Sequence, residues 1–473
     1  MSGRCLLPAL LLAAALVGCE EQTASPTSIE PGPAFAKGGV SSQDGFVTTT
    51  PAFACGLLPG IEIKALATVG DVMPGSGEIL AAIPDGIGIW GGTRYMSMML
   101  NHEISGSARV SQFTIDTKSA EIIDHRYVID GSEGYSRLCS AEWVDARDGF
   151  PGGYFFTGEE TDDGVQLAID AQGRVTEMPW IGRYNHENQI SVPGFPGHVV
   201  VLNFDDKGGS GRSLSELYMY VGRSSNDVLR GRGTLYVFRS TDPSIQTAGQ
   251  IGVGQTITGT WTRIPDAEML SSAELQDFVD AAGAFQFVRL EDGFYDKRPG
   301  RGASALFYDT GRSSVPNADG SPMDPWGSVY YLAMDPHDPA GAAELTLLAR
   351  SDGPDLGWAS PDNGDMNASG TVMLQEDPAN GPWNRPVRIW QFQLSGDRSL
   401  SSATAVVEAV DPDCPGAGCS DVNDWETSGI VDASEYFGPG TWLFDVQAHG
   451  KDVPGQPEQP ENGQLLWLKV PGS

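Results

Sequence analysis

The sequence predicts a nearly all-β chain, and three observations lead to this fold class. The 473 residues contain 60 glycines and 32 prolines, which interrupt the chain at short intervals. Between them lie short runs rich in β-branched and aromatic residues, which favour strands over helices. No Pro/Ser-rich break follows residue 44, so one closed architecture is favoured over separate modules. A single β-propeller meets this description, and several linked sandwiches remain the alternative.

The first 44 residues have the composition of an export signal followed by a tether. Residues 6–17 are nearly all Leu and Ala, too few to span a membrane but typical of a signal peptide. Residues 16–19, Leu-Val-Gly-Cys, form a lipobox, so we expect removal of residues 1–18 and lipidation of Cys19. Residues 19–44 are rich in Pro, Gly, Ser and Thr and predict a flexible tether. Residues 45–473 are then the propeller domain.

These features predict a location and exclude some partners. The folded domain is expected in the cell envelope outside the cytoplasm, held to the membrane only by the N-terminal lipid, with the outer membrane favoured over the inner. No other stretch approaches the roughly 18 uninterrupted apolar residues that a transmembrane helix needs. The net charge of −33 comes from 29 Lys and Arg against 62 Asp and Glu. Such a charge repels nucleic acid, which we exclude as a partner.

Strands are predicted wherever β-branched and aromatic residues cluster between turn residues. In chain order the predicted strands are Tyr154–Thr157, His198–Phe204, Glu216–Val221, Thr234–Phe238, Ser304–Tyr308, Ser328–Met334, Glu344–Leu348, Thr371–Leu374, Val387–Leu394, Trp442–Val446 and Gln464–Val470. The last run is expected to close the ring by pairing with Glu62–Val69. One helix is predicted over Asp266–Ala282, where apolar residues recur at helical spacing.

Four cysteines remain after Cys5 leaves with the signal peptide and Cys19 takes lipid. An even number suits an oxidising compartment. Cys414 and Cys419 bracket a four-residue loop that a disulfide can close. Cys55 with Cys139 is the default second bond, and a metal-binding role for Cys139 competes with it.

Several strand-like runs end in a cluster of acidic residues. These ends are Asn101–Glu103, Gly158–Glu160, Asn185–Glu187, Asn203–Asp206, Glu291–Asp292 and Gln375–Asp377. Calcium takes six to eight oxygen ligands, so strand ends that converge on one axis can build a multi-metal site, whereas divergent ends are only solvated turns. Two acidic loops, Asp362–Asn367 and Asp421–Glu426, resemble calcium loops in chemistry but lack the EF-hand spacing.

The order of these segments resembles the PhoX-type bacterial alkaline phosphatases. The resemblance rests on Leu58–Asp71, Pro84–Gly86, Asn101–Glu103, Gly158–Glu160, Gly182–Glu187, Phe204–Asp206, Glu216–Val221, Phe287–Asp292, Pro361–Asn363, Glu376–Asp377 and Phe444–His449. It implies a six-bladed propeller with iron and calcium in its mouth. It also implies an enzyme that hydrolyses small phosphate monoesters outside the cytoplasm.

The resemblance assigns roles to individual residues. Glu160, Glu187 and Glu291 match metal-binding glutamates, and Glu376 or Asp377 matches a further acidic ligand. Arg289 matches an arginine that grips the substrate phosphate, and its planar guanidinium suits a bidentate contact. The cations would neutralise phosphoryl charge, and a metal-bound oxide or hydroxide is the expected nucleophile.

Cys139 matches an iron-binding thiolate of the same family. Residues 140–153 lack the Gly-, Thr- and Trp-rich turn of the family pattern, and Gly158 stands where that pattern has a second cysteine. These departures, together with Cys55 as a partner, favour a disulfide over an iron ligand and calcium over iron. Two other functions stay open: a catalytically silent calcium-binding propeller that serves as a surface interaction module, and a calcium-dependent lactonase-like propeller.

Overall fold

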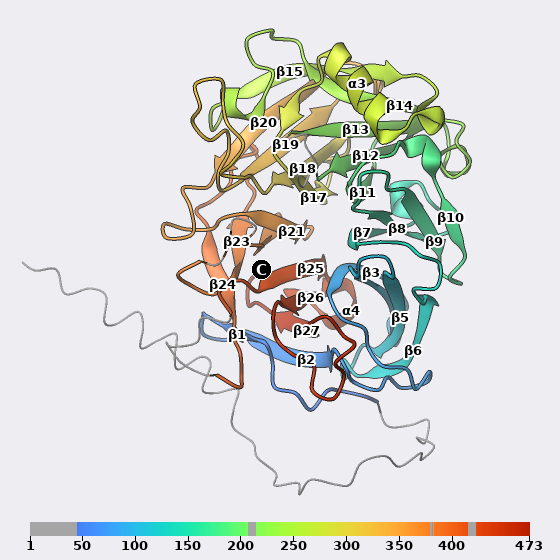
Figure 1. Ribbon diagram of the computed structural model, residues 1–473, viewed down its shortest axis with the longest axis vertical. Coiled ribbons are helices and arrows are strands. Elements are labelled where there is room, and N and C mark those ends of the chain that lie inside the picture. The colour runs from blue at the N-terminus through green and yellow to red at the C-terminus, as the bar shows by residue number, and fades with distance from the viewer. Residues whose placement is uncertain (1–44, 207–213, 379–380, 382, 415–421) are drawn as a thin grey trace, which may run out of the picture.

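The computed structural model describes residues 45–206, 214–378, 381, 383–414 and 422–473 and confirms the predicted β-propeller. Figure 1 shows its sheets arranged around a central axis. The predicted signal peptide, Cys19, the tether and Cys419 lie outside the described residues. Among the described residues, no helix is long and apolar enough to cross a membrane.

Two sheets of four antiparallel strands come first in the chain. One contains β3 (Pro84–Gly91), β4 (Tyr95–His102), β5 (Arg109–Asp116) and β6 (Ile122–Ile129). The other contains β7 (Leu138–Val144), β8 (Tyr154–Glu159), β9 (Gln166–Asp170) and β10 (Val175–Glu177).

A ten-stranded sheet follows, and its path runs β11-β12-β13-β14-β15-β20-β19-β18-β17, with β16 paired to β13. Its first strands are β11 (His186–Val192), β12 (Val199–Asp205), β13 (Ser215–Gly222), β14 (Thr234–Ser240) and β15 (Thr256–Ile264). The others are β16 (Gln286–Phe287), β17 (Leu290–Tyr295), β18 (Ser304–Asp309), β19 (Ser328–Met334) and β20 (Ala343–Arg350). Because two strand groups share this sheet, the count of six blades stays a prediction.

The last two sheets bring together the two ends of the described chain. The five-stranded sheet contains β1 (Ala54–Gly56), β21 (Pro361–Met366), β22 (Thr371–Glu376), β23 (Arg388–Gln393) and β24 (Thr404–Ala409). The four-stranded sheet contains β2 (Glu62–Thr68), β25 (Glu426–Asp432), β26 (Thr441–Ala448) and β27 (Asn462–Lys469). Strand β2 pairs with β27, from Glu62 opposite Lys469 to Thr68 opposite Gln464, which confirms the predicted closure of the ring.

Helices are few and short. They are η2 (Ala146–Asp148), η3 (Pro179–Ile181), α2 (Ser225–Val228), η4 (Ala248–Gln250), η5 (Ala267–Met269), α3 (Ser272–Ala282) and α4 (Ser434–Phe437). The single helix predicted over residues 266–282 is wrong in its first half. Asp266 has a left-handed φ of 49°, and the Ser271 side chain accepts a hydrogen bond from the backbone N–H of Glu274, so α3 starts only after Ser271.

Six strands surround the central axis as a closed ring. β3 contacts β7, which contacts β11, and the contacts continue through β17, β21 and β25 back to β3. Apolar side chains fill the spaces between sheets; Phe204, for example, packs on Phe307 with ring centroids 5.5 Å apart. The inner face of the ring is therefore the place where polar side chains can gather.

Each strand of this ring carries a one-residue bulge near its start. In five strands the bulge contains a pair of consecutive residues: Asp85 and Gly86 in β3, Cys139 and Ser140 in β7, Glu187 and Asn188 in β11, Glu291 and Asp292 in β17, and Asp362 and Asn363 in β21. In β25 the extra residue is Gly429, whose φ is 44°. A bulge re-aims side chains that a regular strand would alternate between faces. Five of these bulges therefore place four acidic residues and one cysteine around the axis.

Removal of residues 464–473 should destabilise the whole ring, because it deletes most of β27, the partner of both β2 and β26. We expect the unfolding temperature of the truncated protein to fall by about 10 °C or more, or the protein not to fold. Thermal unfolding followed by circular dichroism measures this. A chain that ends at Val470 keeps β27 and is the control. Equal unfolding temperatures for the two truncations would refute the closure.

Candidate metal centre

The bulged strand starts bring acidic groups into three overlapping triads. Within each triad the ligand atoms lie within 4.8 Å of one another, and the triads are Asp85 with Glu103 and Cys139, Cys139 with Glu160 and Glu187, and Glu187 with Glu291 and Asp362. Cys139 and Glu187 are each shared by two triads. We call these seven residues the acidic cluster. The predicted ligands Glu160, Glu187, Glu291 and Cys139 all belong to it.

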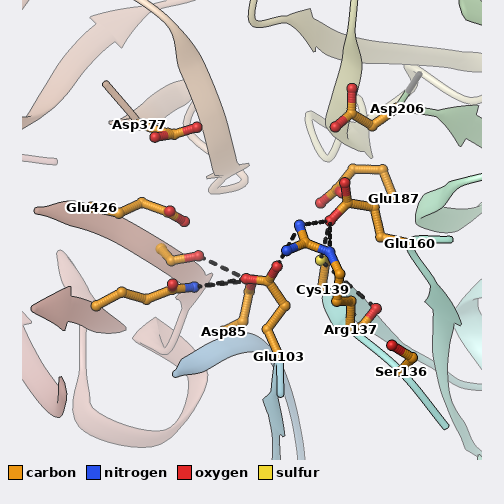
Figure 2. A network of polar contacts seen from close by, with 12 residues as sticks. Asp85, Glu103, Ser136, Arg137, Cys139, Glu160, Glu187, Asp206, Asp377 and Glu426 are labelled. Carbon is orange, nitrogen blue, oxygen red and sulfur yellow. Dashed lines mark hydrogen bonds and ion pairs between the residues drawn. The ribbon is translucent and has the colours of Figure 1, made fainter. Parts of the chain in front are cut away.

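Three further carboxylates surround the acidic cluster. They are Asp206, Asp377 and Glu426, and Figure 2 shows them at the same site as Glu160 and Glu187. Burial raises the pKa of Glu187 and Glu291, and the charge of Asp206 adds to this rise. The site thus gathers nine carboxylates and one thiol.

Two arginines hold parts of the cluster together. Arg137 Nη2 lies 2.6 Å from Glu103 Oε1, and Arg137 Nε donates to Glu160 Oε2 at 2.9 Å. Arg289 donates through Nε and Nη2 to the two carboxylate oxygens of Asp206, at 2.9 and 2.7 Å. Two arginines neutralise only a minority of nine carboxylates.

The geometry of Arg289 differs from the sequence-based expectation of bidentate phosphate binding. Its Nε and Nη2 edge is occupied by Asp206, and Nη2 also lies 2.9 Å from Glu291 Oε1. Its Nη1 has Asp377 Oδ2 at 3.9 Å, beyond hydrogen-bond distance. Asp206 and Glu291 therefore fix the guanidinium so that Nη1 remains available to an anion.

Burial and mutual repulsion perturb the carboxylates strongly. Burial, followed by the charge of Asp206, raises the pKa of Glu160 to about 8. Burial and the charge of Glu426 raise the pKa of Asp377 to about 7. The carboxyl groups of Glu187 and Asp362 have pKa values well above the ordinary range for the same kind of reason. Such a group of buried acids needs either bound protons or cations.

The donor set fits hard divalent cations. Oxygen ligands from several strands suit calcium, which takes six to eight oxygens in flexible geometry. The single sulfur belongs to Cys139, whose Sγ lies 3.1 Å from Glu160 Oε2. Burial, then the charges of Glu103 and Glu187, raises the pKa of this thiol well above its usual range. A thiolate ligand here would need a cation to offset that effect.

The predicted disulfide between Cys55 and Cys139 is wrong. Cys139 is a buried free thiol that faces the acidic cluster from β7. Cys55 lies in β1, which pairs with β24 in a different sheet. Cys419 is outside the described residues, so the predicted bond between Cys414 and Cys419 stays a prediction.

The structure separates the two acidic residues that the sequence left as alternatives. The carboxylate of Glu376 accepts hydrogen bonds from both Nη atoms of Arg385, at 2.7 Å each, and from the indole N–H of Trp390, at 2.8 Å. It also accepts the backbone N–H groups of Ala359 and Arg388. These donors hold Glu376 away from the cluster, whereas the neighbouring Asp377 faces Arg289.

A layer of hydrogen bonds supports the acidic cluster from below. Asn363 Nδ2 donates to Ser140 Oγ at 2.6 Å, and Ser140 Oγ donates to Glu187 Oε1 at 2.7 Å. Asn363 Oδ1 lies 2.7 Å from Ser428 Oγ, which is 2.9 Å from Asp85 Oδ1. The chain of contacts joins the two outer triads and fixes their relative position. We call Ser140, Asn363 and Ser428 the supporting layer.

His449 stabilises one edge of the site. It lies between Glu461, at 2.8 Å, and Glu426, at 3.4 Å. Burial alone would lower the pKa of His449, but hydrogen bonds with these two carboxylates raise it to about 11. The imidazolium in turn lowers the pKa of Glu426 against the effect of burial. The charge of His449 also acts against the rise in the pKa of Asp377.

Sequence reasoning missed Arg137, although a signal was present. Arg137 stands two residues before Cys139, as Arg289 stands two residues before Glu291. The repeated spacing on two bulged strands marks an arginine at the edge of the site. Arg137 also has a φ of 50°, which turns the chain just before β7.

The geometry agrees with what comparisons with known proteins find. The family described as "Alkaline phosphatase PhoX" matches residues 166–414, more than half of the chain. The chain belongs to the PhoX alkaline phosphatase family. This match includes Glu187, Arg289 and Glu291, while Cys139 and Glu160 lie before it.

Solved structures agree with this membership at the level of fold. The Pseudomonas fluorescens PhoX in complex with vanadate, a transition state analogue, has a TM-score of 0.65 at 14% identity, covering 90% of this chain and 97% of that one. A luciferin-regenerating enzyme (TM-score 0.42, 9% identity, 85% and 96% covered) and a Fusarium graminearum α-L-arabinofuranosidase (0.39, 10%, 85% and 97%) are more distant and support no inference. A search among curated proteins finds no similar sequence.

The metal-free PhoX family member should lose stability as the pH rises from about 5 to 8. The pKa values of Glu160, about 8, and Asp377, about 7, lie above those of an unfolded chain. In this pH range the folded state therefore binds more protons than the unfolded state, so the free energy of unfolding falls as the pH rises. Thermal unfolding of chelator-treated protein measures this effect, and saturating calcium should weaken it. A chelated protein with the same stability at both ends of the range would contradict the assignment.

Loss of Asn363 should weaken cation binding, because the supporting layer would no longer fix Glu187 and Asp85. We expect Asn363→Ala to lower calcium affinity about tenfold, as measured by calorimetry. Ser140→Ala should act through the same chain of contacts, so the double variant should lose less than the sum of the two. The exposed Asn226→Ala is the control. Full additivity would argue against a connected layer.

Proposed function

We propose that this PhoX family member hydrolyses phosphate esters with the help of cations held by the acidic cluster. The observation that carries the proposal is the convergence of six carboxylates and one thiol at the inner ring, next to an arginine whose Nη1 is beyond hydrogen-bond distance of its nearest carboxylate, Asp377 at 3.9 Å. Family membership supports a phosphatase, and the shared fold supports the same conclusion.

The acidic cluster and Asp377 would hold the cations, with calcium favoured because oxygen atoms dominate the donor set. Bound cations supply positive charge to the phosphoryl group and lower the pKa of water. Arg289 Nη1 is positioned to donate to a phosphate oxygen, since Asp206 and Glu291 fix the rest of its guanidinium. Arg137 holds Glu103 and Glu160 in place as ligands through its Nε and Nη2.

Iron is less favoured than calcium as the bound metal, although the free Cys139 keeps a soft ligand at the centre. Cys139 belongs to two of the three triads, so a metal ion bound at either of these two triads would contact both a sulfur atom and carboxylate oxygens. Metal analysis of protein purified without chelators therefore decides the question. Calcium alone, or calcium with iron, agrees with the proposal, while no bound metal and no phosphate release would refute it.

Arg289→Lys tests the phosphate-binding role, because lysine keeps the positive charge but lacks the planar guanidinium. We expect kcat/KM for p-nitrophenyl phosphate to fall about 100-fold while the bound metal content stays the same. Arg388→Lys is the control, since Arg388 pairs with Glu408 away from the site. A lactonase or a silent binding protein would show no phosphatase activity to lose. Unchanged kcat/KM in the Arg289 variant would remove it from the mechanism.

We further propose that the protein is exported and anchored to the envelope by lipid on Cys19. The support is the lipobox at residues 16–19 behind an apolar signal sequence. Incorporation of labelled palmitate in cells should be lost in Cys19→Ser and retained in Cys5→Ser. Equal labelling of both variants would contradict the anchor.

A further inference from the structure

A cavity lies inside the ring of the six inner strands, at their later residues and not at the acidic cluster. It has a volume of about 550 Å³ and is lined by residues from all six inner strands. The members of the acidic cluster that lie on these strands are near the strand starts, while the cavity is lined by later residues such as Ile89, Trp143 and Tyr295. Asn188 and Asp292 lie between the two regions. The cavity is therefore a separate site toward the other end of the channel, of a size that suits a small organic ligand.

The cavity already holds an ammonium group of the protein. Lys297 Nζ lies 2.5 and 2.7 Å from the two oxygens of Asp365, and 6.0 Å from the centroid of the Tyr295 ring. Two carboxylate oxygens beside the face of an aromatic ring are a common environment for a bound ammonium group. The wall of this cavity thus has the chemistry of an amine-binding site.

Two other carboxylates of the cavity, Glu142 and Asp148, make no direct ion pair with a described residue, although the charge of Lys297 acts against the rise that burial causes in the pKa of both. Asp148 is 7% exposed, and its Oδ1 is buried without a hydrogen-bond partner, while Oδ2 accepts the backbone N–H of Asp145. Glu142 Oε2 accepts only the backbone N–H of Ser191, at 2.8 Å. Burial, followed by the charge of Asp148, raises the pKa of Glu142, and both acids line the same cavity.

The nearby cations are already paired. Arg147 contacts Asp145 at 2.9 Å and Glu435 at 3.1 Å, and Lys297 is held by Asp365. Among the described residues, the groups of three ligand atoms that converge within 4.8 Å belong to the acidic cluster, and none includes Glu142 or Asp148. The dispersed carboxylates of this cavity therefore suit an extended organic cation better than a metal ion.

We propose that this cavity binds a small organic polyamine, with Glu142 and Asp148 as the counter-ions of its ammonium groups and the ring of Trp143 against its carbon chain. The ligand reproduces at Glu142 and Asp148 the contact that Lys297 makes with Asp365. Aromatic faces stabilise both the alkyl chain and the adjacent charge of such a ligand. This site is independent of phosphate-ester hydrolysis.

Spermidine is the probe, and calorimetry on the calcium-loaded full-length protein is the measurement. We expect one saturable site, and Glu142→Gln with Asp148→Asn should weaken binding about tenfold or more because two charge contacts are lost. The double variant should keep its phosphatase activity and its metal content. Circular dichroism establishes that it is folded. Equal affinity for wild type and the double variant would overturn the proposal, as would absence of saturable binding.

A second variant should change the affinity for spermidine in the opposite direction. Lys297→Met removes the resident ammonium and frees Asp365, so spermidine should bind more tightly. Lys118→Met removes the same charge from an exposed position and is the matched control. Tighter binding in the Lys297 variant alone supports the cavity, and equal effects of the two variants would reduce the interaction to general attraction by an acidic protein. Glu187→Gln should not alter spermidine binding, and a large loss there would place the amine in the acidic cluster instead.

Discussion

The repulsion among buried carboxylates at one level of the channel is the constraint on which the rest of this structure depends. Nine acidic side chains meet there, and Arg137, Arg289 and His449 offset only part of their charge. An isolated protein can reduce the repulsion by holding protons, as the raised pKa values indicate. Cations do so with the ligands fully charged, which is why the arrangement is typical of a metal centre.

The β-bulges are the structural means by which this concentration of charge is reached. A regular strand would turn alternate residues away from the axis, so that one strand could offer few consecutive polar groups to it. In five of the inner strands the extra residue lets the first member of a pair reach the acidic cluster and the second reach the level below. Asn363 and Ser140 at that lower level then hold the ligands above them.

The same inner ring carries two chemically different regions. Near the strand starts, carboxylate oxygens converge within the reach of a single ion, whereas further along the channel they are dispersed among aromatic and aliphatic walls. The hydrogen-bonded pair Asn188 and Asp292 lies between them. Ligand geometry, more than total charge, therefore distinguishes a site for metal ions from one for organic cations.

Sequence alone determined the all-β class, the closing strand and the acidic ends of β4, β8, β12 and β22, because each of these follows from local composition and spacing, whereas Glu187 and Glu291 lie at the starts of β11 and β17 and not at strand ends. Only the tertiary structure decided that Cys139 is free, that Asp377 and not Glu376 faces the site, and that Asp206 occupies the paired edge of Arg289. These outcomes depend on which side chains from distant strands meet at the axis. A linear pattern contains the residues, but the bulges and the closure of the ring set the distances between them.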